Sequence, residues 1–231
     1  DGEFNIDAAS SVTSHDLTFK NAGEKTTTVT NDFDVNILGD GVTTLNVTSS
    51  DDTNYVELRD ADNAITTLNI SGDAMFSSDQ ALVSTSLDTV TVTGTGGVKL
   101  DVSASNNMTV TGGDGNDTFL FGSTLNDNDT IDLGDGTDTV SVSVAALTSS
   151  TNASVEGFNA ASDVEVAASS ATAGDGVSFN ADVFSSINQF SFGGVTPANN
   201  AGDADGDNAA TITGTNSDDS IVVTGSMTGG T

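Results

Sequence analysis

The pattern with the clearest chemistry runs from Gly112 to Leu120 and reads Gly-Gly-Asp-Gly-Asn-Asp-Thr-Phe-Leu. It fits the nonapeptide G-G-x-G-x-D-x-U-x, in which U is an apolar residue, at every specified position. The glycines allow the backbone to turn tightly and to aim carbonyl oxygens inward, and the aspartate at the sixth position supplies a carboxylate. Calcium is a hard cation that takes six to eight oxygen ligands, so carbonyls and two aspartates from adjacent turns would satisfy it. The sequence therefore predicts a calcium site built from this loop and a second one like it.

Three looser copies of the nonapeptide lie further along the chain. The copy at 133–141 loses only its first glycine. The segment 126–131 keeps the acidic sixth position and the apolar residue that follows, and the segment 214–221 is more degenerate. Asp117 and Asp138, the sixth residues of the two best copies, lie 21 residues apart, whereas two nonapeptides span about 18. The spacing predicts a pair of calcium-binding loops and leaves their stacking open.

The candidate calcium ligands are side chains and backbone carbonyls of these loops and of one further acidic segment. They belong to Gly113, Asp114, Gly115, Asn116, Asp117, Asp127, Asp129, Gly134, Asp135, Gly136, Asp138, Asp203, Asp205, Asp207 and Asp219. The segment 203–208 begins like an EF-hand loop, but Gly214 stands where that loop requires a bidentate glutamate, so a weaker site and a plain loop are equal alternatives. Every one of these loops has the alternative of a solvent-exposed turn, since Asp, Asn and Gly are common in turns. The complete nonapeptide order favours calcium at Asp117 and Asp138.

The charge of the chain agrees with a bound cation and excludes several partners. Lys and Arg number 4 against 34 Asp and Glu, which gives a formal net charge of -30. Such a chain repels itself unless divalent ions, high salt or a solvated acidic face relieve the repulsion. Nucleic acid and anionic lipid surfaces attract clusters of Lys and Arg, so we expect neither as a partner. The chain has no Cys, and an exported protein of this kind must obtain its rigidity from hydrogen-bond ladders or from metal.

The elements that position these loops are short strands in a repeat. Thr-Thr-Leu-Asn-Val at 43–47 recurs as Thr-Thr-Leu-Asn-Ile at 66–70, 23 residues later. A looser copy at 88–92 follows after 22 residues, and the next copy, 107–110, aligns through Met108 after 18. In each copy two apolar residues flank one polar residue, so both apolar side chains point to one face of a strand.

These repeats predict an all-β fold, a parallel β-solenoid (β-helix or β-roll) with calcium-binding turns. The segments are too short and too rich in Thr and Val for helices. Regular apolar runs argue against the disorder that strong acidity can signal. An immunoglobulin-like sandwich also has many short strands, but it gives no reason for a nearly verbatim repeat.

Changes in composition divide the chain into three parts. Residues 1–143 form the predicted solenoid, with the calcium motifs at 112–142. Residues 144–195 lose the alternation and predict an irregular or partly helical insertion that covers a flank, and 196–231 predict a loop followed by resumed solenoid strands. No apolar run is long enough to cross a membrane. Because the chain starts at Asp1 without Met and stops in Gly-Gly-Thr, we expect a fragment of a longer protein.

The motif at 112–142 resembles the repeats-in-toxin (RTX) group of secreted bacterial proteins, and in particular its calcium-dependent surface-layer (S-layer) proteins. The rest of the chain is similar to them in composition: rich in Thr, Ala, Gly, Asn and Asp, without Cys, and with very few Lys and Arg. The resemblance implies export without an N-terminal signal and folding triggered by extracellular calcium. It also implies assembly into a two-dimensional lattice over lipopolysaccharide.

The predicted function is therefore that of a calcium-dependent structural S-layer protein, secreted to the bacterial cell surface. Its expected partners are further copies of itself and cell-surface polysaccharide or lipopolysaccharide, and its cofactor is several Ca²⁺ ions. We expect no enzyme activity, because His15 is the one histidine and no pair of carboxylates stands out as acid and base. The alternatives are a calcium-binding adhesin or biofilm-matrix module, and the non-catalytic part of an exported polysaccharide- or protein-degrading enzyme.

Overall fold

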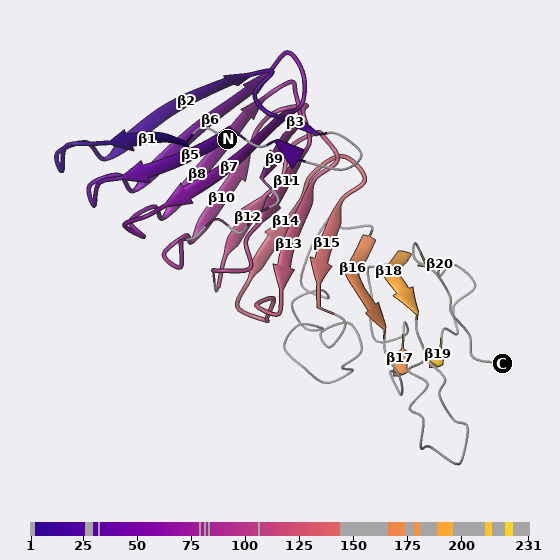
Figure 1. Cartoon of the computed structure of the whole chain (residues 1–231). Coiled ribbons are helices and arrows are strands. Elements are labelled where there is room, and N and C mark those ends of the chain that lie inside the picture. Colours follow the sequence, from indigo (N-terminus) through magenta and orange to yellow (C-terminus); the bar gives the residue numbers. More distant parts are fainter. Residues whose placement is uncertain are drawn as a thin grey trace.

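The computed structural model describes residues 3–25, 30–31, 33–78, 80, 82, 84–105, 107–143, 166–173, 178–180, 189–195, 211–213 and 220–223. Every regular element in these residues is a β-strand, and none of them lies in a helix. Figure 1 shows the strands stacked beside one another from the N-terminal to the C-terminal end.

Two parallel sheets contain most of the strands. The larger sheet has ten strands in the order β1 (Glu3–Asp7), β5 (Phe33–Leu38), β7 (Asn54–Asp60), β9 (Phe76–Ser78), β11 (Val98–Asp101), β13 (Thr118–Gly122), β15 (Thr139–Val142), β16 (Val166–Ala173), β18 (Gln189–Val195) and β20 (Ser220–Val223). The smaller sheet has six strands in the order β14 (Thr130–Asp132), β12 (Thr109–Thr111), β10 (Thr89–Val92), β8 (Thr67–Gly72), β6 (Thr44–Ser50) and β2 (Ser14–Lys20). Two minor pairs are β17 (Ser178–Asn180) with β19 (Thr211–Thr213), and β3 (Glu24–Lys25) with β4 (Thr30–Asn31).

From β5 to β15 the chain alternates between the two main sheets, and each strand from β7 to β13 pairs with the strands two before and two after it. All the neighbours in both main sheets are parallel. This arrangement confirms the predicted parallel β-solenoid. It excludes the sandwich alternative, because a sandwich of that kind is built from antiparallel strands.

The interior consists of aliphatic columns that run along the stack. Leu45 pairs with Leu68, Leu68 with Val90, and Val90 with Val110, and all four side chains are 0% exposed. Residues between these positions point outward, as the period of two requires. The predicted alternation of apolar and polar residues is therefore confirmed in the smaller sheet.

The outward positions form polar ladders that follow the same register. The Asn69 side-chain amide donates to Asn46 Oδ1 over 2.8 Å, and the Asn46 amide donates to Asp16 Oδ1 over 2.7 Å. Because a side-chain amide has both a donor and an acceptor, identical residues in successive turns can bond in a chain.

One predicted register is wrong. The sequence alignment placed Met108 beside Val90, but in the structure Val90 pairs with Val110, 20 residues later, and Met108 lies just before β12. Met108 is nevertheless 1% exposed. An apolar residue buried at a corner between two strands carries the same sequence signal as an apolar residue within a strand, which explains the error.

Within the segment 144–195, β16 and β18 extend the larger sheet, and Phe190 on β18 is 0% exposed. β17 also lies in this segment and pairs with β19. The other residues of the segment lie outside the described residues, so an irregular or partly helical insertion there remains a prediction. The described residues include no helix that is long and apolar enough to span a membrane.

The buried columns predict that two neighbouring substitutions lower the free energy of unfolding by very different amounts. Leu68→Ala removes a fully buried side chain and should lower the free energy of unfolding by about 2–5 kcal/mol. Asn69→Ala removes an outward ladder bond and should cost about 0.5–1.5 kcal/mol. Urea denaturation followed by circular dichroism in the far ultraviolet measures both values. Equal losses would contradict the assignment of inward and outward faces.

Candidate calcium-binding turns

The loops that carry the two best motifs stack directly on each other at one corner of the solenoid. One loop joins β12 to β13 and the other joins β14 to β15. Their flanking strands are in register, since Thr118 pairs with Thr139. The backbone N–H of Asp135 donates to the Gly113 carbonyl over 3.0 Å. One turn of the solenoid here is 21 residues long, which is why the spacing between the motifs exceeds that of two nonapeptides.

The glycines of these loops are required by close approach between turns. A Cβ atom on Gly113 would lie 2.5 Å from the Gly94 carbonyl oxygen, and one on Gly115 would lie 2.5 Å from the Gly97 nitrogen. Only in the second loop do glycines adopt positive φ, 78° at Gly134 and 145° at Gly136. The sequence predicted that glycines permit tight turning, and the stacking of backbone on backbone is a second requirement that it did not predict.

Two aspartates of these loops are fully buried and bond to backbone N–H groups. Asp117 is 0% exposed, and its Oδ1 accepts from Val98 N over 2.8 Å while its Oδ2 accepts from Gly113 N over 3.0 Å. Asp138 is also 0% exposed, and its Oδ1 accepts from Asp117 N over 2.7 Å. Each carboxylate thus bonds a backbone N–H of the preceding turn and connects the two turns at the corner.

The remaining polar side chains of these two loops lie on the outside. Asp114 and Asp135 are both exposed, and the Asp135 N–H bond to Gly113 places them in adjacent turns. Asn116 is exposed as well, and its Oδ1 accepts from Thr137 N over 2.9 Å. The structure therefore brings together an inner pair of aspartates, Asp117 and Asp138, and an outer pair.

The third motif lies at the opposite corner, between β13 and β14. Asp129 is 6% exposed, and its Oδ1 accepts from Met108 N over 2.6 Å while its Oδ2 accepts from Asn126 N over 2.8 Å. Asp127 in the same loop is exposed. Asp127 and Asp129 are thus separated by the width of a sheet from the paired loops, although Asp129 bonds the preceding turn as Asp117 does.

Two buried polar residues at other corners were not among the predicted site residues. Asn54 is 0% exposed, accepts from Ala22 N over 2.7 Å, and donates to Ser49 Oγ over 2.8 Å. Asp60 is 2% exposed, and its Oδ2 accepts from Ile65 N over 2.8 Å. Asp60 begins the acidic segment 60–63, which the sequence favours as a solvated turn, and Asn54 directly precedes the alternating run 55–58. Both residues stand at an end of β7.

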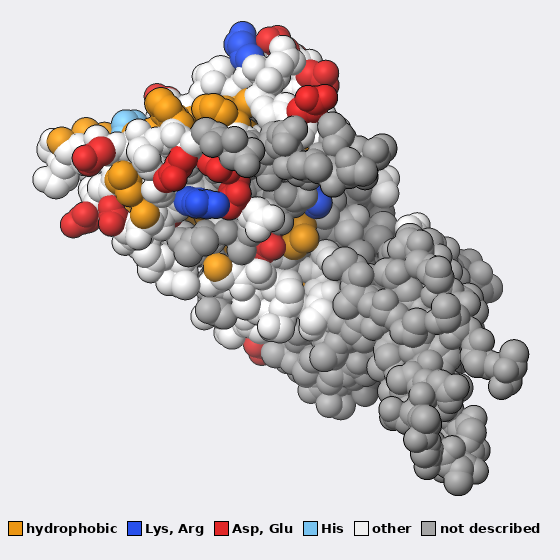
Figure 2. Space-filling view, viewed as in Figure 1, with side chains coloured by type: hydrophobic (Ala, Val, Ile, Leu, Met, Phe, Trp, Pro, Cys, Tyr) orange, Lys and Arg blue, Asp and Glu red, His pale blue; other side chains and the backbone are white. Residues whose placement is uncertain are grey.

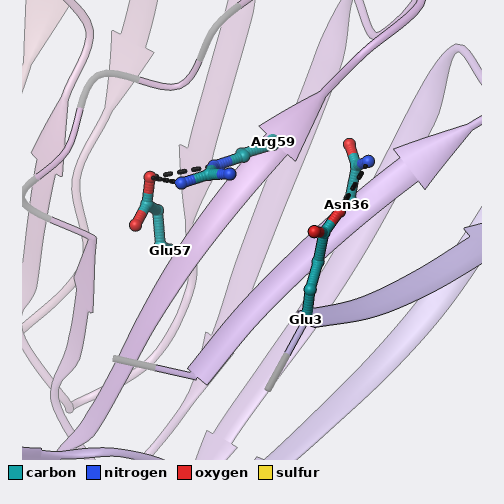
Figure 3. A network of polar contacts seen from close by, with 4 residues as sticks. All are labelled: Glu3, Asn36, Glu57 and Arg59. Carbon is teal, nitrogen blue, oxygen red and sulfur yellow. Dashed lines mark hydrogen bonds and ion pairs between the residues drawn. The ribbon is translucent and has the colours of Figure 1, made fainter. Parts of the chain in front are cut away.

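The chain has few basic side chains with which to compensate these carboxylates. All four Lys and Arg residues lie before residue 100. One of them, Arg59, is paired on the outer face of β7 with Glu57, whose Oε1 accepts from Arg59 Nη2 over 2.8 Å. Figure 3 shows this pair beside the contact from the Asn36 amide to Glu3. Glu57 raises the pKa of the Arg59 guanidinium above its ordinary value.

The donor chemistry of the paired loops fits a hard cation. Carboxylates, an amide and backbone carbonyls supply oxygen alone, and the Asp117 carboxylate, with about four lone-pair sites in total, accepts two hydrogen bonds. In the described part of the chain, no three His, Cys, Asp or Glu side chains converge as a metal-binding group. An ion held here would therefore take a large share of its ligands from carbonyls, as calcium sites often do. The predicted ligands Asp203, Asp205, Asp207 and Asp219 lie outside the described residues.

No protein-family model, no curated protein and no solved structure matches this chain. The resemblance to RTX proteins consequently rests on the nonapeptide motif and on composition. The structure adds the stacking of the two loops that carry the motif.

Asp129 and Asp127 provide a matched test of the corner bonds. Asp129→Ala leaves the N–H groups of Met108 and Asn126 without their acceptor, and at about 1–3 kcal/mol for each unsatisfied group we expect a loss of roughly 2–6 kcal/mol in unfolding free energy. Asp127→Ala removes the same charge from an exposed position and should change stability by about 0.5 kcal/mol or less. Urea denaturation in EDTA makes the comparison independent of calcium. Similar values for both variants would refute the proposed role of the buried carboxylate.

The buried Asp117 carboxyl predicts an unusual dependence on pH. Burial raises its pKa above the ordinary value of 3.8, while the N–H groups of Gly113 and Val98 oppose that shift. The folded chain therefore binds this proton more tightly than the unfolded chain does. In EDTA, we expect the unfolding free energy to fall as the pH rises from about 4 through the raised pKa, and then to level off.

If calcium binds at this corner, it should reverse this slope, because a metal ion binds only the deprotonated form of a carboxylate. Urea denaturation across the same pH range, in EDTA and in saturating calcium, gives the two slopes. The other acidic groups also lower stability as the pH rises, because they repel one another once they are deprotonated. Asp117→Asn shows how much of the pH dependence is due to Asp117 itself. A slope in EDTA that rises with pH, or that Asp117→Asn leaves unchanged, would contradict the prediction.

Proposed function

We propose that this chain is a calcium-dependent structural protein of the RTX type, secreted to the bacterial surface, where copies assemble into a two-dimensional S-layer lattice. The observation that carries the proposal is the stacking of the loops 112–117 and 133–138, with Asp117 and Asp138 buried one above the other. The complete nonapeptide in the first of these loops supports calcium as the ion.

Calcium would solve the electrostatic problem of the chain. Its net charge of -30 opposes compaction, and the buried Asp117 adds a desolvated carboxylate. With a dissociation constant of about 10–100 μM and external calcium near 1 mM, each site stabilises the fold by roughly 1.4–2.7 kcal/mol. Several sites would decide whether the chain folds. In a cytosol that is poor in calcium, this contribution vanishes and the chain stays in a form suited to export.

A structural role fits the distribution of polar groups better than catalysis does. The buried aspartates bond to backbone N–H groups, as expected for parts of the framework. His15 on β2 faces inward and pairs with Leu45. It therefore lies next to the buried aliphatic column that begins at Leu45, and not in a polar cluster. Stacked turns also offer long faces and edges for contacts between copies.

Calcium titration with matched variants tests the proposal. We expect the wild-type chain to bind several ions, to gain thermal stability in calcium but much less in magnesium, and to form ordered sheets visible by electron microscopy. Asp117→Ala should weaken calcium binding at least tenfold and disturb the sheets. Asp88→Ala makes the same change in charge at an exposed residue and should behave as wild type.

Three outcomes would count against the proposal. An unchanged melting curve in EDTA would remove calcium from it. Isolated rods in calcium, without sheets, would favour an adhesin or matrix module. Turnover of polysaccharide or peptide substrates would favour the exported-enzyme alternative.

A further inference from the structure

The outer face of the smaller sheet carries two columns of polar side chains, each with one residue from each of the strands β6, β8, β10, β12 and β14. The first column consists of Thr44, Thr67, Thr89, Thr109 and Thr130. The second column, two residues further along each strand, consists of Asn46, Asn69, Thr91, Thr111 and Asp132. The strands pair without a register shift, so both columns run unbroken from β6 to β14.

The middle of this face carries no charge. The outward positions of β6, β8, β10 and β12 hold Thr, Asn and Ser alone. The outer face of the larger sheet differs, since it holds Glu57 and Arg59 on β7 and Lys99 and Asp101 on β11. Figure 2 shows charged side chains of both signs gathered on the face in view near the N-terminal end of the stack. Strand propensity favours Thr in both sheets alike, so it does not explain why only one face excludes charge in a chain of net charge -30.

Buried side chains hold the two columns in position. Leu68, Val90 and Val110 lie between the two columns on their strands, point into the core and are 0% exposed. Along the second column, the Asn69 amide donates to Asn46 Oδ1 over 2.8 Å. A surface that is fixed in this way loses little conformational entropy when it binds a rigid ligand.

The strands also set the spacing of the columns in two directions. Neighbouring strands lie about 4.7–4.9 Å apart, and alternate residues of one strand lie about 6.6 Å apart. A prism face of hexagonal ice repeats its water oxygens at two perpendicular distances close to these. Each Thr hydroxyl is both a donor and an acceptor, so a column of them can take the place of a row of water molecules at an ice surface.

Other classes of ligand fit this face less well. The cores of protein interfaces are enriched in aromatic residues, Met and Arg, and nucleic acids require Lys and Arg. The outward positions of β6, β8, β10 and β12 offer none of these. The charges next to the second column lie at its two ends, on Asp16 of β2, which pairs with Asn46, and on Asp132 of β14. A repeating surface without charge fits an uncharged ligand that repeats at the same spacing.

We propose that the outer face of the smaller sheet binds the surface of ice through these two columns. The function goes beyond the surface lattice and does not depend on it. A protein adsorbed on a growing crystal blocks the addition of water where it lies. The chain should therefore slow the growth of ice and lower the freezing temperature below the melting temperature.

Adsorption to ice with matched variants tests the proposal. In saturating calcium, wild type should be enriched in slowly grown polycrystalline ice and should hold ice crystals unchanged in size below their melting temperature. Thr89→Lys places a long charged side chain in the middle of the first column and should reduce the amount bound to ice at least tenfold. Ser141→Lys adds the same side chain at an outward position of β15 in the larger sheet and should bind ice as wild type does. Circular dichroism and calcium titration check that both variants fold and bind calcium normally.

Three results would overturn the proposal. The first is exclusion of wild type from growing ice, and the second is equal adsorption of Thr89→Lys and Ser141→Lys. The third is binding to crystalline cellulose or chitin in place of ice, lost in Thr89→Lys, which would assign the face to a polysaccharide. Electron microscopy of the same samples keeps the two proposals apart. Ordered sheets without ice binding would refute this inference and leave the lattice, whereas ice binding without sheets would refute the lattice and leave this inference.

Discussion

The fold depends on how backbone N–H groups are satisfied at the corners of the solenoid. Within the strands each N–H finds a carbonyl in the next turn, but where the chain bends between sheets that regular pairing stops. Asp117, Asp129 and Asp138 supply carboxylate acceptors there, each bonding an N–H of the turn before. Asn54 serves a similar purpose with an amide at an earlier corner. Side chains at a few corner positions thus connect successive turns and hold the columns of the core in register.

Burying carboxylates at the corners removes them from water, which destabilises their charged form, and a bound cation would offset this cost. A buried carboxylate is stabilised by N–H donors and destabilised by loss of water, and for Asp117 the loss of water dominates, since its pKa is raised. A protein with many basic residues could place an arginine beside it. No basic side chain lowers the pKa of Asp117, so a bound cation, as proposed, would supply the compensating charge. Asp117 therefore contributes to the framework and, under the proposed function, would make its stability depend on calcium.

The sequence predicted the features that depend on local periodicity, and it missed those that depend on which turn lies above which. The columns through Leu45 and Leu68 follow from a repeat of two apolar residues around one polar residue. The alignment failed at Met108, because nothing local distinguishes a buried corner residue from a strand residue, and the true partner of Val90 is Val110. The bond from Met108 N to Asp129 could not be predicted either, since it requires knowledge of which N–H group lacks a carbonyl. The exposure of Phe4 likewise depends on its place in the first turn and not on its own pattern, which is that of a core residue.

The order of strands suggests how the proposed calcium site would affect the later part of the solenoid. In the larger sheet, β13 follows the first motif loop and β15 follows the second, and β16, β18 and β20 stack beyond β15. In a solenoid each turn contacts only its neighbours, so the pairing of β16 depends directly on the turn that contains β15. Calcium bound at Asp117 and Asp138, as proposed, would stabilise that turn and, through it, the strands stacked on it.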